Sequence, residues 1–189
     1  INASGTESTD ASKDFTVKVD VTGLNPNTIY YYRFFDDLGN VSAKGRTRTS
    51  PQSTDVISHL RFAVTSCTSI YSGYFNGYKR ISERNDIDFV MHLGDYIYDF
   101  VDEDEEIRVP TPYPSVPTNL QEWRDRHAYY LLDPDLRAAR QNHPWIAIWD
   151  NHDISSVGDP DFIESEKAFY EYLPIRVPDP DSTKIWRKF

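Results

Sequence analysis

The sequence contains a single cysteine, Cys67, in 189 residues, so a disulfide cannot form within the chain. It also lacks any run of about 18 apolar residues, which excludes a transmembrane helix. Basic residues are fewer than acidic ones, 20 against 30, so the formal net charge is -10 at pH 7. A surface for nucleic acid or for an anionic membrane is therefore not expected. No signal peptide is visible, but the chain does not begin with Met, so this absence does not indicate a location.

Apolar and aromatic residues are abundant. Hydrophobic residues make up 39% of the chain and aromatic residues 14%, which predicts a packed core rather than disorder. A chain of this length holds one domain of ordinary size, or a small domain and part of another. The excess of acidic residues suits a protein that binds metal cations, although most acidic proteins do not bind them.

The first part of the chain has the pattern of a small all-β unit. Residues 15–21 and 29–35 alternate between apolar and polar, with a turn rich in Gly, Asn and Pro between them, and residues 41–49 predict a third strand. The stretch GLNPNTIYYYRF resembles the segment of fibronectin-type sandwiches in which a Tyr hydroxyl caps the preceding loop. Since three strands do not close a sandwich, we expect part of a fibronectin-like β-sandwich over 1–52.

After a predicted linker at 53–59 the pattern changes, and residues 60–189 predict a separate α/β domain. Nearly continuous apolar strands alternate with segments of helical spacing, and the second helical segment is interrupted at Pro134. Such strands are typical of a parallel sheet whose crossover connections contain helices. The predicted strands are 60–67, 88–95 and 144–153, and the predicted helical segments are 73–85 and 119–143.

Polar side chains stand at the ends of all three predicted strands. They are Cys67, Asp95, Asn151, His152 and Asp153. The carboxyl ends of parallel strands meet at one edge of a sheet, where ligands bind. Thiolate, carboxylate, amide and imidazole groups bind metals, and a carboxylate such as Asp95 can bridge two cations that activate a water. His152, with Asp153 beside it, has the chemistry of a proton donor.

Each of these groups also has a simpler interpretation. A Gly-Asp pair alone is usually a turn, an Asn-His pair is usually a loop, and a single cysteine such as Cys67 is usually a small buried hydrophobe. The joint occurrence of all of them on separate strand ends favours the metal site.

The motifs resemble those of a known family. Gly94-Asp95 and Asn151-His152-Asp153 are similar to the second and third sequence blocks of the calcineurin-like metallophosphoesterases. The first block of that superfamily, D-x-H, is absent, and the first strand ends in Ser66-Cys67 instead. This ending, with HLGDYIY, WDNHD, the stretch from WRDRHAYY to the third strand, FYEYLPIR and a preceding β-rich domain, is the pattern of the PhoD-like alkaline phosphatases.

The resemblance implies a function and a set of ligands. It implies a metallophosphoesterase-like parallel sheet and an enzyme that hydrolyses phosphate monoesters, diesters or both. It also implies a secreted, periplasmic or cell-surface protein. By resemblance, Cys67 and Tyr98 are ligands of Fe(III), Asp95 bridges iron to Ca²⁺, and Asn151 faces Ca²⁺. Other divalent metals remain possible. The family often has Asp where this chain has Asn151.

Other residues have alternatives that the sequence leaves open. Arg124 is either a phosphate-binding residue or a member of an ion pair on a helix surface. Tyr96 is expected to point into packing, and His92 is expected to be a hydrogen-bonded core residue. The acidic run 102–106 predicts a solvated loop.

The superfamily needs further His or Asp blocks from later strands, and the sequence ends at KIWRKF before any of them. We therefore expect a fragment of a longer enzyme that is inactive by itself. The alternative is a binding module in which a β-sandwich and a degenerate phosphoesterase-like domain recognise a cell-envelope polymer. The oligomeric state is not indicated by the sequence.

Overall fold

A computed structural model describes residues 3–113 and 115–176, so the outer ends of both predicted domains lie outside the described residues. The elements along the chain are η1 (Ala11–Lys13), β1 (Ile29–Tyr32), β2 (Gly45–Arg48), β3 (Phe62–Thr65), α1 (Asn76–Ser82), β4 (Phe89–Leu93), η2 (Glu103–Glu105), α2 (Leu120–Tyr130), α3 (Pro134–Asn142), β5 (Trp145–Ile148) and α4 (Phe162–Tyr172). None of the described helices is long and apolar enough to cross a bilayer.

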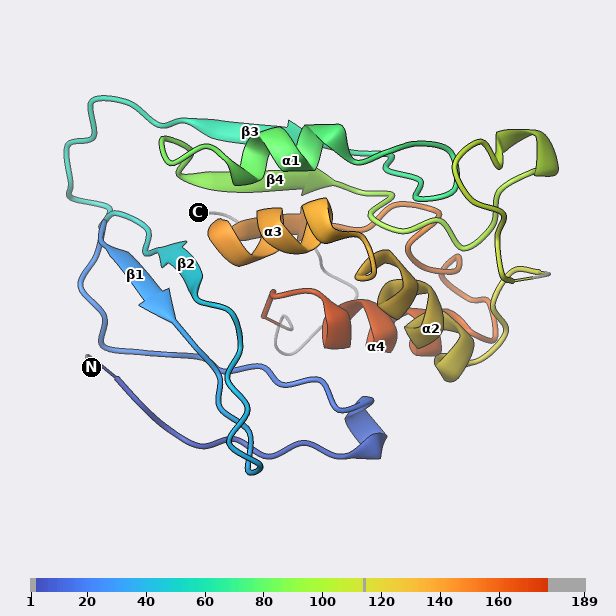
Figure 1. Ribbon diagram of the computed structural model, residues 1–189, viewed down its shortest axis with the longest axis horizontal. Helices are drawn as coiled ribbons and strands as arrows, with labels where there is room; N and C mark the ends of the chain where they lie inside the picture. The colour runs from blue at the N-terminus through green and yellow to red at the C-terminus, as the bar shows by residue number, and fades with distance from the viewer. Residues whose placement is uncertain (1–2, 114, 177–189) are drawn as a thin grey trace.

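The strands β3, β4 and β5 form one parallel sheet, in that order. Val64 pairs with Met91, and Met91 pairs with Ile146 on the other side of β4. Figure 1 shows the arrowheads of β3 and β4 pointing the same way, so the loops that follow them leave from the same edge. The prediction of a parallel sheet is confirmed, and its carboxyl edge is where the predicted site residues lie.

Helices α1 and α3 cover one face of this sheet. His92 and Trp145 are buried there, and the Tyr78 hydroxyl of α1 lies 3.1 Å from His92 Nε2. On the opposite face, Val64 and Leu93 are 54% and 44% exposed. Strands of a parallel sheet are apolar on both sides because both faces are normally covered. Within the described residues only one face of β3 is covered.

Capping residues mark where α2 and α3 begin. The Asn119 side chain accepts a hydrogen bond from the Glu122 backbone N–H at the start of α2. Pro134 is the first residue of α3, and Asp133 caps that helix. The predicted interruption at Pro134 is therefore correct, because proline suits the first turn of a helix but not its interior. Helix α4 was not predicted.

The N-terminal unit is smaller than expected. β1 and β2 pair antiparallel, but residues 15–21 do not form the predicted strand. Phe15 and Val19 are 69% and 44% exposed, and no other strand among the described residues pairs with this segment. A strand needs a neighbour to bond its backbone N–H and C=O groups. The Tyr30 hydroxyl does accept a hydrogen bond from the Asn25 N–H, as predicted, but a fibronectin-like sandwich is not confirmed.

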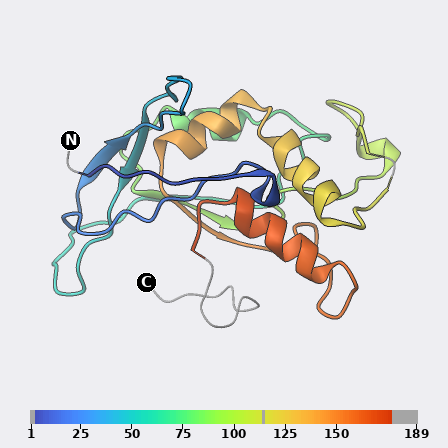
Figure 2. The ribbon, with the colours of Figure 1, turned by 90° about the horizontal axis from the view of Figure 1, so that it is seen from below.

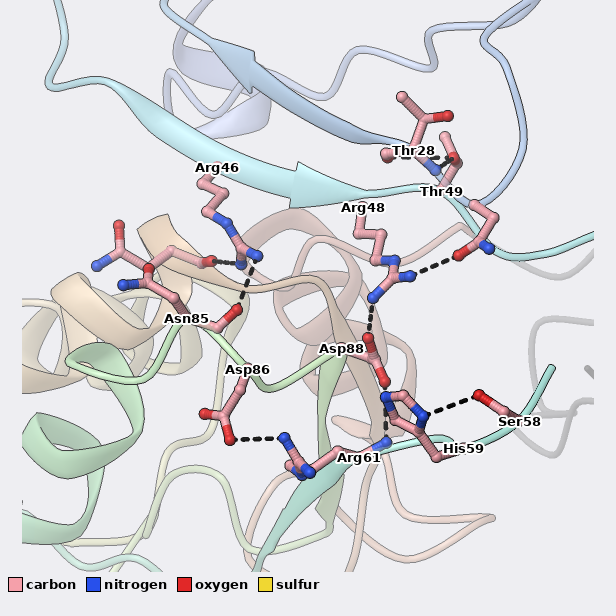
Figure 3. Close-up of polar contacts among 12 residues, drawn as sticks. Thr28, Arg46, Arg48, Thr49, Ser58, His59, Arg61, Asn85, Asp86 and Asp88 are labelled. Atoms are coloured by element: carbon pink, nitrogen blue, oxygen red, sulfur yellow. Dashed lines mark hydrogen bonds and ion pairs between the residues drawn. The ribbon is translucent and has the colours of Figure 1, made fainter.

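The β1–β2 unit is attached to the amino ends of the parallel strands, away from the carboxyl edge (Figures 1 and 3). Arg46 donates to the backbone carbonyls of Asn85 and Asn142, each at 3.2 Å. Arg48 pairs with Asp88, whose other carboxylate oxygen accepts from the Arg61 N–H at 2.8 Å. Figure 2 shows that the first residues run back along the molecule, so that η1 lies beside α4.

Candidate active site

The loops that follow β3 and β4 are joined by backbone hydrogen bonds. The Cys67 N–H donates to the Gly94 carbonyl at 3.2 Å, and the Thr68 N–H donates to the Asp95 carbonyl at 3.1 Å. Cys67 and Asp95 both have left-handed backbones, with φ of 54° and 53°. A positive φ is uncommon for residues other than Gly, and such strained positions cluster at functional sites.

Gly94 allows the loop after β5 to approach this pair of loops. A Cβ at this position would lie 2.5 Å from Asp150 Cβ, and the φ of Gly94 is +100°. Only glycine fits both the close approach and the backbone angle. The approach places the His152 N–H 3.4 Å from Asp95 Oδ1. The structure thus brings together the ends of all three strands, as the sequence predicts.

Asp153 is fully buried between two of these loops. Its Oδ1 accepts from the Tyr96 and Ile97 N–H groups at 2.8 and 3.0 Å, and its Oδ2 accepts from the Asp150 N–H at 3.0 Å. Burial raises the pKa of Asp153 to about 7, although the backbone donors oppose this shift. Asp153 therefore ties the loop after β4 to the loop after β5. Its catalytic role stays a prediction.

The phenol of Tyr98 lies close to the thiol and the carboxylate. Burial raises the pKa of Tyr98 above its ordinary value, and the nearby charges of Asp95 and Cys67 raise it further. A bound cation would act in the opposite direction and favour the phenolate. Cys67 is exposed rather than buried as a small hydrophobe. Three of the predicted metal ligands thus share one region.

His152 packs between an aromatic ring and a carboxylate. The Tyr98 ring is stacked on its imidazole, with centroids 4.3 Å apart, and its Nδ1 lies 2.7 Å from Asp99 Oδ1. Burial raises the pKa of Asp99, while the hydrogen bond with His152 lowers it. Asp99 is not among the site residues that the sequence patterns indicate. Its only signal was its position four residues after Asp95 in the same loop.

Asn151, the fourth predicted ligand, is exposed at the edge of the site. It lines an open pocket of about 490 Å³, together with Asp99. Hydroxyl, carboxylate and apolar side chains from the loops before α2 and α4 complete the wall; they include Thr118, Ser155, Ser156, Asp159, Val116 and Ile154. The pocket has room for part of a small organic molecule beside Asp99, the residue that is paired with His152.

The donor set is suitable for a metal but incomplete. Thiol, phenol and carboxylate are the groups that Fe(III) binds, and an amide oxygen suits Ca²⁺. Within residues 3–113 and 115–176, however, no three His, Cys, Asp or Glu side chains are arranged to hold a metal ion. The residues present therefore fit part of a ligand shell.

Arg124 is 5% exposed, and its guanidinium is paired with a carboxylate on α4. Its Nε and Nη2 lie 2.7 and 2.8 Å from the two carboxylate oxygens of Glu171, and Nη2 also donates to the Ser12 carbonyl at 2.7 Å. The structure thus shows an ion pair, but a buried one between α2 and α4 rather than one on a helix surface. Its substrate-binding role stays a prediction without a contact in its favour.

Of the three remaining expectations, those for His92 and Tyr96 are confirmed and that for the acidic run is confirmed in part. His92 is fully buried and bonded to Tyr78, and burial lowers its pKa to about 3. Tyr96 is 1% exposed, and its hydroxyl accepts from Arg140. Within the acidic run 102–106, residues 102–105 are exposed around η2, whereas Glu106 is half-buried and accepts from the Thr111 N–H at 2.8 Å.

Comparisons with known proteins match both parts of the chain. The family model described as PhoD-like phosphatase matches residues 62–156, and that of the PhoD-like phosphatase N-terminal domain matches residues 1–51. Alkaline phosphatase D of Bacillus subtilis (strain 168) is 32% identical over 208 residues, covering 98% of this chain and 35% of the relative. A solved structure of PhoD matches with a TM-score of 0.86 and 32% identity, covering 98% of this chain and 39% of that one. The chain therefore spans little more than a third of the proteins it matches.

Proposed function

The chain belongs to the PhoD-like phosphatase family, and from this premise we propose that the complete protein hydrolyses phosphate esters at the carboxyl edge of the parallel sheet. The observation that carries the proposal is the convergence of Cys67, Asp95 and His152 from three separate strand ends. Monoesters and diesters are both included as substrates. The alternative of a non-catalytic polymer-binding module has no support in the comparisons.

We propose that the site holds Fe(III) and Ca²⁺, with other divalent metals as substitutes. Cys67 and Tyr98 would hold iron, Asp95 would bridge the two cations, and Asn151 would face calcium. The closeness of the Tyr98 phenol to Cys67 and Asp95 supports this assignment. When bound, such cations neutralise the transferring phosphoryl group and make a water acidic enough to attack near neutral pH.

His152 is the proposed proton donor to the leaving oxygen. Its imidazole is partly exposed beside the carboxyl edge, and its Nδ1 is bound by Asp99. Its Nε2 makes no hydrogen bond within the described part of the chain, so this nitrogen is available to a substrate. A positioned donor of this kind contributes roughly 10²–10⁴ in rate.

The decisive experiment uses two substrates on the full-length enzyme. The leaving group of a nitrophenyl phosphate is a stable anion and needs little protonation. The alkoxide that leaves an alkyl phosphate is strongly basic and depends on a proton donor. Asp95→Asn removes the negative charge of the proposed bridge, so we expect loss of metal and of activity toward both substrates. His152→Ala should keep its metal and slow the alkyl ester by about 10²–10⁴, with a smaller effect on the nitrophenyl ester. Unchanged turnover by Asp95→Asn would sink the phosphoesterase proposal. Nitrophenyl diesters assayed beside monoesters decide between the two substrate classes.

Metal identity has its own readout. A thiolate and a phenolate on Fe(III) give a visible charge-transfer absorption, so Cys67→Ser and Tyr98→Phe should each shift or bleach it. Cys67→Ser replaces the sulfur by an oxygen donor, whereas Cys67→Ala leaves no donor atom, so comparing the two separates the effect of the sulfur from the effect of losing a ligand. A colourless, iron-free and fully active preparation contradicts the iron assignment, and leaves a site of other metals intact.

We propose in addition that residues 1–189 alone are inactive. The incomplete donor set and the exposed face of β3 in the described residues support this. The same assays, run on this chain and on the full-length protein at equal metal content, test it. Activity of the isolated chain would show that no further residues are needed.

A further inference from the structure

Asp99, which is not among the site residues predicted from the sequence, is hydrogen-bonded to His152, the proposed proton donor. Asp99 Oδ1 lies 2.7 Å from His152 Nδ1. The Asp99 side chain is 12% exposed and that of His152 is 31% exposed, so the pair is partly shielded from water. Asp99 belongs to the loop after β4 and His152 to the loop after β5, so the contact depends on the approach of the two loops at Gly94.

The imidazole is held on more than one side. Tyr98 stacks on the ring, and the Tyr98 N–H donates at 2.9 Å to the hydroxyl of Tyr130, which is fully buried. The same hydroxyl accepts from the Ile70 N–H at 3.2 Å. The aromatic ring under the imidazole is therefore anchored to the core. Stacking on Tyr98 fixes the plane of the His152 imidazole. The hydrogen bond to Asp99 fixes which way Nδ1 and Nε2 point within that plane.

Resting on the proposed role of His152, we propose that Asp99 is a positioning residue that holds the imidazole with Nε2 toward the leaving oxygen. A carboxylate accepts a hydrogen bond from Nδ1–H and so fixes both the tautomer and the orientation of the ring. Nε2 then carries the proton that is transferred. As the P–O bond breaks, its electron pair stays on the leaving oxygen and takes this proton. The neutral imidazole that remains keeps its Nδ1–H on Asp99 and regains a proton from solvent.

The location of Asp99 supports a role at the site rather than in the core. Asp99 and Asn151 both line the open pocket of about 490 Å³. A leaving group in this pocket would lie next to the residue that holds the proton donor. By contrast, Asp153 has its carboxylate oxygens on three backbone N–H groups and serves the loops themselves.

The test compares Asp99→Ala, Asp99→Asn and His152→Ala in the full-length enzyme on the nitrophenyl and alkyl phosphates. We expect Asp99→Ala to slow the alkyl ester by about 10²-fold and the nitrophenyl ester by a few-fold, since it weakens the same proton transfer. Asp99→Asn keeps an oxygen acceptor for Nδ1–H, so it should recover part of the alkyl ester rate. In the His152→Ala background, Asp99→Ala should cause little further loss, because residues that act as a unit are not additive.

Asp88→Asn is the matched control. It breaks an ion pair with Arg48 whose side chains are 32% and 14% exposed, close to the exposure of the His152–Asp99 pair, at the amino ends of the strands. It should leave the ratio of the two substrate rates unchanged.

Two outcomes overturn the inference, and they differ. If His152→Ala is selective for the alkyl ester but both Asp99 variants slow the two esters equally or not at all, Asp99 is not a positioning residue and the proposed function stands. If His152→Ala is itself unselective, the proton-donor role fails and the role of Asp99 fails with it.

Discussion

The Arg124–Glu171 pair offers a direct test of whether Arg124 supports the fold or the substrate. The two side chains are 6% and 11% exposed, and they are joined by two hydrogen bonds of 2.7 and 2.8 Å. Arg124→Met keeps the apolar stem and removes the guanidinium. Among the described residues, the Glu171 carboxylate then keeps only the longer ion pair with Lys167, at 3.9 Å.

The magnitude follows from this burial. Removing one partner of a buried pair costs about 3–5 kcal/mol, because the other charge is left uncompensated. Glu171→Gln keeps one oxygen acceptor, and Arg124 keeps the Ser12 carbonyl, so about 1–3 kcal/mol is expected. The double change Arg124→Met with Glu171→Leu replaces the pair by apolar groups and should recover most of the loss.

Denaturant unfolding and steady-state kinetics of the full-length variants measure both effects. The expected result is a loss of stability in each single variant, with KM for a phosphate ester unchanged. Arg80→Met is the control, because its pair with Glu83 is 81% and 48% exposed and is worth at most about 1 kcal/mol. The structural role is refuted if Arg124→Met leaves stability intact and raises KM while Glu171→Gln does not.

Three further changes test other parts of the structure. Burial and then the Arg140 charge lower the pKa of His127 to about 3, and neither ring nitrogen has a hydrogen-bond partner among the described residues. Relative to an unfolded pKa of about 6.5, this histidine should cost the native state about 2 kcal/mol of stability at pH 5, as the unfolded chain takes up a proton first. His127→Phe should therefore reduce the loss of stability between pH 7 and pH 5 in denaturant titrations, and an unchanged loss contradicts the assignment. Gly94→Ala should lower both stability and activity because of the 2.5 Å approach to Asp150. Gly77→Ala, in α1 with open space at its Cβ, should leave activity unchanged and raise stability slightly, by up to about 1 kcal/mol, in the same assays. Asn119→Ala removes the cap of α2 and should cost about 1 kcal/mol in thermal unfolding without changing kcat, and a change in kcat would place this helix end at the site.

Local patterns were sufficient for the three parallel strands, for helices α1 to α3 and for the edge at which the site lies. The apolar runs before Cys67 and Asp95 predict parallel strands, and Pro134 correctly divides α2 from α3. These features depend on the residue itself and its near neighbours, as do helix caps and the φ of proline. The alternation at 15–21 has the same local character, yet no strand forms there, because a strand also requires a partner that the local pattern does not supply.

By itself, the sequence determined which residues stand at the strand ends, and hence that Cys67, Asp95 and His152 converge. Tertiary structure decided which groups touch. Asp99 rather than Asp153 binds His152, and Arg124 pairs with Glu171 on another helix. The physical reason is that strand order and direction bring loops to a common edge, whereas each contact within the edge depends on backbone approaches of a few ångströms, such as the one at Gly94, between segments distant in sequence.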